Sequence, residues 1–138
     1  MIYIALIALI AVCGIVMVWP MIFTSKSIRN YKGVSLDAFT TKLALEGVPE
    51  NISAAVFSYY KEKARYKPFK PSPDMNIVDV FGELPEDTDE AAIDLLKQLH
   101  LEAPSEAARM AWSGGDINTA GDMAKWLFWA STHQSPQV

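Results

Sequence analysis

The feature that most constrains this chain is an unbroken apolar segment at its amino terminus, Met1 to Phe23. No charged side chain occurs before Lys26. A helix rises about 1.5 Å per residue, so roughly 22 such residues cover about 33 Å, enough to cross a hydrocarbon layer of about 30 Å. The sequence therefore predicts one membrane-spanning helix, with residues 1–25 as an anchor.

Two kinds of cleaved leader are the alternatives to a permanent anchor. A secretory signal peptide has a basic stretch before a short apolar core, whereas here no basic residue precedes the apolar run, and the run is longer. A lipoprotein signal would use Cys13, but Val12 stands where a small residue is expected. We therefore expect the segment to be retained as an uncleaved anchor.

The charges beside the segment predict its orientation. Lys26, Arg29 and Lys32 follow it, and no Lys or Arg precedes it. The positive-inside rule then places the amino terminus outside and the later residues in the cytoplasm, so the domain is expected at the inner (cytoplasmic) membrane. Trp19 lies near the end of the span, where an indole ring favours the headgroup layer. We expect these four residues to contact membrane lipid.

The rest of the chain is patterned as one small all-α domain. Residues 26–50 are expected to form a juxtamembrane linker and a short helix capped by Ser35. Residues 51–132 are expected to form a bundle of four to five short helices, and residues 133–138 a disordered tail. The other helix starts are predicted at Asn51, Asp87, Ser105 and Thr119.

The predicted helices have definite limits and buried faces. The helix from Asn51 to about Arg65 should bury Ile52, Ala55, Val56, Tyr59 and Tyr66, with Phe57 off that face. Prolines make residues 67–86 an ordered loop, in which 76–81 could form a short strand. The next two helices are expected to end near Leu101 and near Trp112, the second at Gly114-Gly115, and the last helix near Thr132.

Charge is divided between two segments of opposite sign. The net charge is −4, and a chain without excess positive charge on one face is not expected to bind nucleic acid. The basic segment contains Lys61, Lys63, Arg65, Lys67 and Lys70. With the interleaved Tyr66 and Phe69 it could lie on anionic lipid, or it could be a plain charged helix end. The acidic segment contains Glu83, Glu86, Asp87, Asp89, Glu90 and Asp94.

The acidic helix start is the candidate protein-binding surface. Carboxylates on one helix end steer encounter with a basic patch on a partner protein, although the same residues could be a solvated helix end. Trp129 is a further candidate, because exposed tryptophans often anchor interfaces; it could equally pack under the linker helix. The candidate partner-binding residues are Glu86, Asp87, Asp89, Glu90, Asp94 and Trp129.

Other chemistry finds little support in the residues. Zinc needs three or four converging ligands, but the chain has one cysteine, Cys13 in the apolar segment, and two separated histidines, His100 and His133. The acidic segment lacks the register of a calcium-binding loop. No serine lies in a nucleophile-elbow motif. We expect no metal, no cofactor and no enzymatic activity.

Four stretches between about Asn51 and Trp129 mark the loop and the helix starts of the domain. They are Pro73-Asp74, Val78-Asp79-Val80-Phe81-Gly82, Asp87-Thr88-Asp89-Glu90-Ala91 and Ile117-Asn118-Thr119-Ala120-Gly121-Asp122-Met123. With these motifs the layout resembles the acyl-carrier-protein fold, in which a first helix leads through a long loop to an acidic second helix, followed by a short third helix and a closing fourth. A divergent bacterial group of acyl-carrier-like proteins of unknown function shares the acidic helix start and a Thr-x-Gly-Asp motif.

The chain departs from that family at the position that matters for its chemistry. Carriers bear phosphopantetheine on a serine in Asp-Ser-Leu, whereas Thr88 is the only hydroxyl residue in the corresponding stretch here. The resemblance therefore implies the fold, with Thr88 as a weak attachment candidate. We expect a non-catalytic adaptor or accessory subunit at the membrane. A membrane-tethered acyl or peptidyl carrier and an immunity-type protein that binds one toxin are the alternatives.

Overall fold

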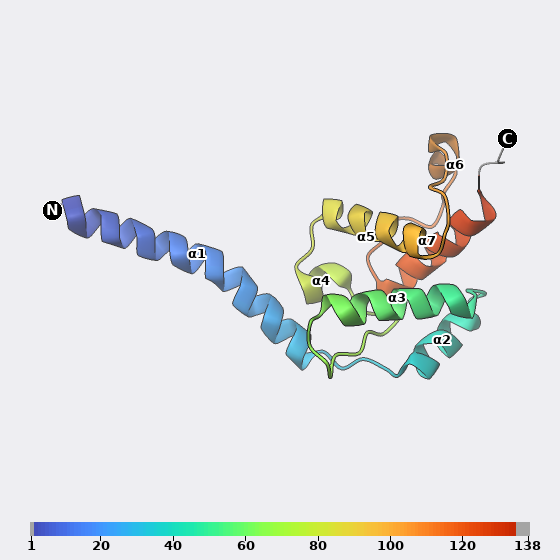
Figure 1. The fold of residues 1–138 in the computed structure, drawn as a ribbon, viewed down its shortest axis with the longest axis horizontal. Coiled ribbons are helices and arrows are strands. Elements are labelled where there is room, and N and C mark those ends of the chain that lie inside the picture. The colour runs from blue at the N-terminus through green and yellow to red at the C-terminus, as the bar shows by residue number, and fades with distance from the viewer. Residues whose placement is uncertain (1, 135–138) are drawn as a thin grey trace.

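A computed structural model of the protein describes residues 2–134, which contain helices and no strand. One long helix projects from a bundle built by the others (Figure 1). This confirms the predicted all-α class. The helices of the described residues are α1 Ile2–Asn30, α2 Leu36–Ala44, α3 Glu50–Lys63, α4 Ile77–Phe81, α5 Pro85–Gln98, α6 Glu106–Met110 and α7 Ala120–Thr132.

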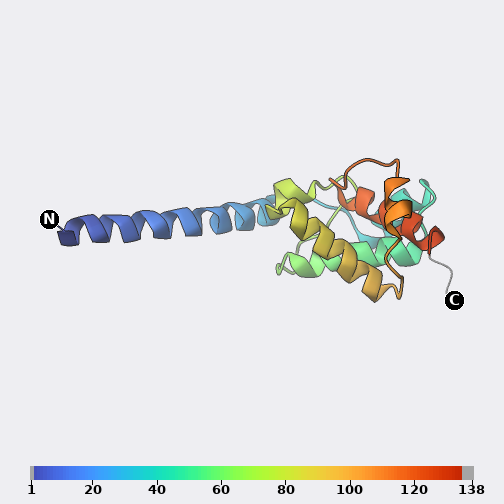
Figure 2. The ribbon, with the colours of Figure 1, turned by 90° about the horizontal axis from the view of Figure 1, so that it is seen from above.

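Helix α1 is long and apolar enough to cross a membrane, as the sequence predicted. Its large apolar side chains point away from the rest of the protein, and Ile28 is its one buried residue in the described part of the chain. A view from above shows that it leaves the bundle without folding back on it (Figure 2). The helix continues through Lys26 and Arg29 to Asn30, so this part of the expected linker is helical.

The residues that follow α1 are docked against the bundle. The rings of Tyr31 and Phe69 lie 5.8 Å apart between centroids, and the Tyr31 hydroxyl hydrogen-bonds the hydroxyl of Ser72. The amide of Val34 donates to the carbonyl of Pro71 at 3.2 Å. A Cβ atom on Gly33 would overlap the Lys70 carbonyl, so the backbones meet where only glycine fits. These contacts tie the end of α1 to the domain.

Helix α3 is the centre of the core, and its buried face is wider than predicted. Phe57, expected off that face, is buried and packs edge-to-face on Phe39 of α2 at 5.3 Å. Tyr66 lies beyond the helix end and is exposed. The difference arises because α3 contacts α2 on one side and α5 and α7 on others. Its buried residues are Ile52, Ser53, Val56, Phe57 and Tyr60, while Ala55 and Tyr59, also predicted to be buried, are partly buried.

Residues 77–81 form the short helix α4, so the strand considered for 76–81 is wrong. The Asn76 side chain accepts from the amide of Asp79 at 3.0 Å, and the amide of Val80 donates to the Asn76 carbonyl at 3.1 Å. Gly82 ends the helix at φ +65°, a left-handed conformation that favours glycine. A single capped turn of this kind leaves little periodicity for a sequence pattern to detect.

Helix starts were predicted well where a hydroxyl side chain caps them. Ser35 and Ser105 accept from amides three residues on, and Thr119 forms a reciprocal capping box with Asp122. The two other predicted caps, Asn51 and Asp87, were wrong by two and three residues, because the caps are Pro49 and Leu84. Helix α5 begins with Pro85, since proline lacks the amide hydrogen that a first helical residue leaves unpaired.

The carboxyl-terminal ends also differ from expectation. Helix α6 stops at Met110, four residues before Gly114. Of the tail expected to be disordered, His133 stacks on Trp129, and the Gln134 side chain bonds both backbone groups of Glu102. Residues 135–138 lie outside the described part. Helix α7 reaches Thr132 and buries Ala120, Met123, Ala124, Leu127 and Ala130, as predicted.

Candidate functional site

The two charged segments meet inside the domain through one ion pair. Glu83 is buried, with its side chain 3% exposed, and it pairs with Lys63 at the end of α3. Lys61 is also engaged, since its ammonium donates to the carbonyls of Lys67 and Phe69, both at 3.0 Å. Phe69 is buried in the core and so cannot lie on lipid. The exposed cations of the basic segment are therefore Arg65, Lys67 and Lys70.

The carboxylates of α5 divide into one that builds the helix and others that face solvent. Asp87 accepts from the amide of Leu84 at 2.9 Å, so it caps the helix as its third residue. Glu86, Asp89, Glu90 and Asp94 are exposed. The helix start therefore carries negative charge that is free to meet a partner, and the amino-terminal end of the helix dipole stabilises that charge.

The pKa values of the Tyr59 and Tyr60 phenols are raised beneath this charged surface. Burial raises the pKa of Tyr59, and the carboxylates of Asp94, Glu83 and Glu90 raise it further. Burial also raises the pKa of Tyr60 far above its usual value, with a further contribution from Glu83. Both phenols thus stay neutral in a region of negative potential.

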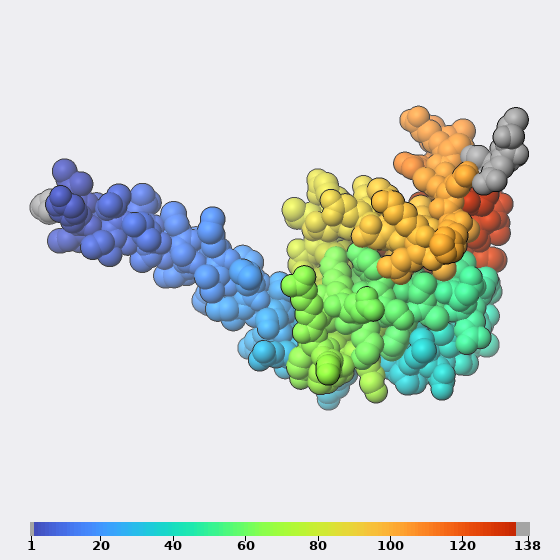
Figure 3. Space-filling view, viewed as in Figure 1, coloured from blue at the N-terminus to red at the C-terminus, as the bar shows by residue number. Residues whose placement is uncertain are grey.

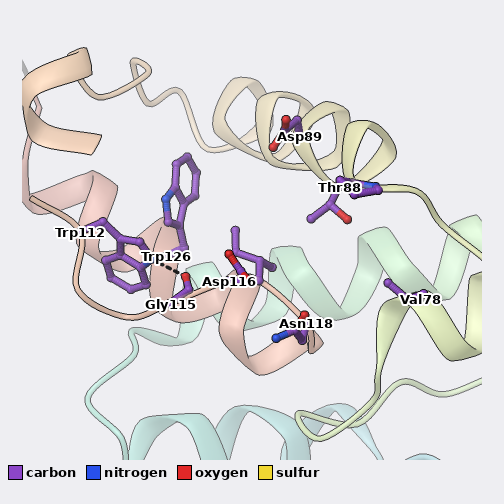
Figure 4. A pocket seen from close by; sticks show the side chains of 10 residues that line it. Val78, Thr88, Asp89, Trp112, Gly115, Asp116, Asn118 and Trp126 are labelled. Atoms are coloured by element: carbon purple, nitrogen blue, oxygen red, sulfur yellow. Dashed lines mark hydrogen bonds between the residues drawn. The ribbon is translucent and has the colours of Figure 1, made fainter. Parts of the chain in front are cut away.

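A pocket of about 410 Å³ opens beside the first turns of α5. Thr88 and Asp89 of α5 line one side, and the loop from Trp112 to Asn118 lines the other (Figure 4). Trp126 of α7 and Val78 of α4 complete the wall. The pocket therefore combines two indole rings with the carboxylates of Asp89 and Asp116.

The tryptophans of this region form one cluster. Trp129 is half-buried and lies behind the pocket, with ring centroids 5.3 Å from Trp112 and 6.5 Å from Trp126. His133 stacks on its other side at 4.6 Å. Trp129, the residue singled out from the sequence, thus supports the two indoles that line the pocket.

Glycine and backbone contacts hold the pocket walls. The Trp112 indole donates to the carbonyl of Gly115 at 2.9 Å, and a Cβ on Gly114 would overlap the Trp112 ring. Gly114 and Gly115 therefore pack against the Trp112 ring, whereas the sequence predicted that they end the preceding helix. The amide of Ile77 donates to the carbonyl of Asn118 at 2.9 Å, which fixes α4 against the start of α7.

The sequence did not identify Trp112, Asp116, Asn118 and Trp126 as site residues. A usable signal was present in Trp112-Ser113-Gly114-Gly115, because a large aromatic followed by a glycine pair indicates close packing of ring on backbone. Asp89 and Thr88 do line the pocket, whereas Glu86, Glu90 and Asp94 lie on the same helix outside its lining.

Of the expected membrane-contact residues, Trp19, Lys26 and Arg29 lie on α1 and Lys32 lies just after it. Trp19 is 70% exposed, and Lys26, Arg29 and Lys32 are exposed as well. The Arg29 guanidinium lies 6.0 Å from the centroid of the Tyr66 ring. Lys32 follows the helix end, in the stretch docked on the loop around Lys70.

Among residues 2–134, no three His, Cys, Asp or Glu side chains gather closely enough to hold a metal ion. His100 is exposed just after α5 in a left-handed conformation, at φ +56°. The pocket offers a ligand carboxylates that can pair with a cation, indole faces that can pack on an apolar or cationic group, and a threonine hydroxyl.

Comparisons of the chain with protein-family models, curated proteins and solved structures gave no match.

Proposed function

We propose that this protein is a membrane-anchored, non-catalytic interaction module whose domain faces the cytoplasm. Helix α1 would be its single span, with the amino terminus outside, as the cations after the apolar segment favour. The domain would bind one partner protein through the start of α5 and the adjoining pocket.

One observation carries the proposal: the tryptophan-lined pocket opens directly beside the exposed carboxylates of α5. Trp112 and Trp126 present indole surface, and Asp89 and Asp116 bring negative charge to the same pocket. A lysine or arginine side chain of a partner satisfies both features, because it pairs with carboxylates and stacks on aromatic faces. Exposed Glu86 and Glu90 would contact neighbouring basic residues and speed the encounter.

The test is co-purification from membranes with the full-length protein as bait. Variant Asp89→Lys/Glu90→Lys reverses two charges at the proposed surface without touching Asp87, which is needed to cap α5. The matched control, Asp37→Lys/Glu50→Lys, makes the same change at exposed positions on α2 and α3. Circular dichroism verifies that both variants fold.

The expected result is a specific partner, with a basic surface, that is lost from the α5 variant and retained by the control. Each reversed charge should raise the dissociation constant of the complex about fivefold or more. The attraction between the carboxylate and the partner's basic residues is lost, and the introduced lysine also repels those residues. Equal recovery of that partner with both variants would contradict the acidic-surface proposal.

A carrier function is the second candidate, and it is favoured by the position of Thr88 on the pocket wall. Its side chain comes from the first turns of α5, the helix whose start bears the prosthetic group in the resembling family (Figure 4). Intact-mass measurement of the protein from its native membrane tests this directly. A phosphopantetheine adduct that disappears in Thr88→Val would establish the carrier, and an unmodified mass would exclude it.

A further inference from the structure

A second pocket, of about 510 Å³, opens between the last turns of α1 and residues 64–66, which directly follow α3. In the space-filling view, the green atoms of the α3 end and the following loop adjoin the blue end of α1 (Figure 3). Met21 and Ile28 of α1 and Ala64 contribute apolar surface, while Arg29, Arg65 and Tyr66 contribute polar groups. No carboxylate of the described residues lines it.

The two arginines are available to a ligand. Neither forms an ion pair with a carboxylate within residues 2–134, where the pairs are Lys42–Asp74, Lys63–Glu83 and Lys125–Glu46. Arg65, two residues after the end of α3, has a left-handed conformation, at φ +49°, which is unusual for a residue with a side chain. This turn places Arg65 and Tyr66 on the side facing α1, where Tyr66 meets the Arg29 guanidinium.

The pocket is graded from apolar to cationic along α1. Its wall begins at Pro20 and Met21, within the apolar segment, and ends at Arg29. These nine or ten residues cover about 13 Å of helix, a distance comparable with the step from acyl carbons through glycerol to phosphate. Two adjoining pockets, of about 430 and 360 Å³, share Arg29 and Arg65 respectively.

We propose that this pocket binds an anionic phospholipid, with the headgroup phosphate held by Arg29 and Arg65 and the first acyl carbons lying along Met21 and Ile28. The inference rests on the proposed membrane anchoring of α1 but not on the partner-binding role. Basic pockets beside membrane helices recognise anionic headgroups because clustered cations attract them and arginine grips phosphate through two hydrogen bonds. A bound lipid would bridge α1 and α3.

The experiment uses the full-length protein in mild detergent with equal amounts of phosphatidylglycerol and phosphatidylcholine, and native mass spectrometry counts the lipids retained. The wild type should keep one phosphatidylglycerol per chain in preference to phosphatidylcholine. Arg29→Gln/Arg65→Gln should reduce that preference about 25-fold, or roughly fivefold for each arginine. The control Arg109→Gln/Lys97→Gln removes the same charge from α6 and α5 and should leave the preference unchanged.

Three results would overturn the proposal. The first is equal retention of both lipids by the wild type, and the second is an unchanged preference in the double arginine variant. The third is displacement by soluble glycerophosphoglycerol at the lipid's own concentration, which would indicate a site for a free phosphodiester. Flotation of the wild type with neutral vesicles tests the membrane anchor separately from the lipid site. A protein that floats but shows no preference for phosphatidylglycerol has the anchor and lacks the lipid site. A protein that does not float has neither.

Discussion

Lys63 and Glu83 form an ion pair across the domain, joining the basic segment of the sequence to the acidic one. The Glu83 side chain is 3% exposed and that of Lys63 is 30% exposed. The Lys63 ammonium also lies 5.8 Å from the centroid of the Phe81 ring and 5.9 Å from that of Tyr59. The pair therefore fixes the chain after α4 against the end of α3, next to α1.

Removing the cation of this pair should destabilise the protein more than neutralising the anion. Lys63→Met leaves a buried carboxylate uncompensated, and we expect a loss of about 2–3 kcal/mol in the free energy of unfolding. Glu83→Gln leaves Lys63 able to reach water and should cost about 1 kcal/mol. Urea unfolding of the full-length protein in detergent, followed by near-ultraviolet circular dichroism, measures both values.

The double variant Lys63→Met/Glu83→Gln gives the decisive comparison. Since glutamine needs no counter-charge, the double variant should be more stable than Lys63→Met alone. The control is Lys42→Met, which breaks an exposed pair with Asp74 and should cost less than about 1 kcal/mol. A double variant that is less stable than Lys63→Met would show that the damage comes from lost packing instead of an unpaired charge.

Tyr60→Phe should leave the protein equally stable or slightly more stable at neutral pH. The Tyr60 ring is fully buried, and its hydroxyl has no hydrogen-bond partner among residues 2–134. A buried hydroxyl without a partner has lost its hydration, so its removal should gain up to about 1 kcal/mol. Tyr66→Phe, at an exposed position, is the control and should change nothing.

The same variant should resist alkaline unfolding. Burial and Glu83 raise the pKa of Tyr60 above its ordinary value of 10.0, so the folded state keeps a proton that the unfolded state releases. Stability must then fall as the pH rises above 10, by up to about 1.4 kcal/mol per pH unit for this one group. The difference between Tyr60→Phe and wild type should therefore widen between pH 10 and 11; a constant difference would contradict the shifted pKa.

The helices of the domain could be predicted from the sequence because their signals are local. The caps at Ser35, Ser105 and Thr119 need only a hydroxyl and an amide three residues on. Helical spacing along α7 is also a local signal, and it predicted five of the buried residues of that helix, leaving out Gly121. Phe57 was misassigned because its burial depends on Phe39, a residue of another helix.

The candidate site depended on tertiary structure to a greater extent. The negative charge of α5 was evident from composition, but the pocket beside it requires the loop after α6 to return across α5 and α7. Glu83, which the sequence placed in the acidic segment, is buried on Lys63. The charge pattern therefore shows which segment is acidic, whereas only the fold shows which of its carboxylates line a pocket and which form an ion pair.

Gly33→Ala should loosen the junction between α1 and the domain. The added Cβ would overlap the Lys70 carbonyl, so the backbone must move and the bond from the Val34 amide to Pro71 should be lost. Trypsin should then cleave after Lys32 several times faster, because cleavage requires local opening of the backbone. Gly14→Ala is the control, since its Cβ would meet no atom of the protein within 4 Å. Cleavage at wild-type rates would contradict a docked junction.

Gly114→Ala should open the tryptophan-lined pocket while leaving the fold intact. Its Cβ would overlap the Trp112 ring, so the indole must rotate away and lose its hydrogen bond to the Gly115 carbonyl, together with its contact with Trp129. We expect a red shift of tryptophan emission, stronger quenching by acrylamide and a loss of stability of about 1–2 kcal/mol. The neighbouring exposed substitution Ser113→Ala is the control and should leave emission unchanged.

The same Gly114→Ala variant tests whether partner binding depends on the pocket. If it does, the variant should bind the partner more weakly even though every carboxylate of α5 is retained. Full binding with a red-shifted emission would restrict the interface to the acidic surface.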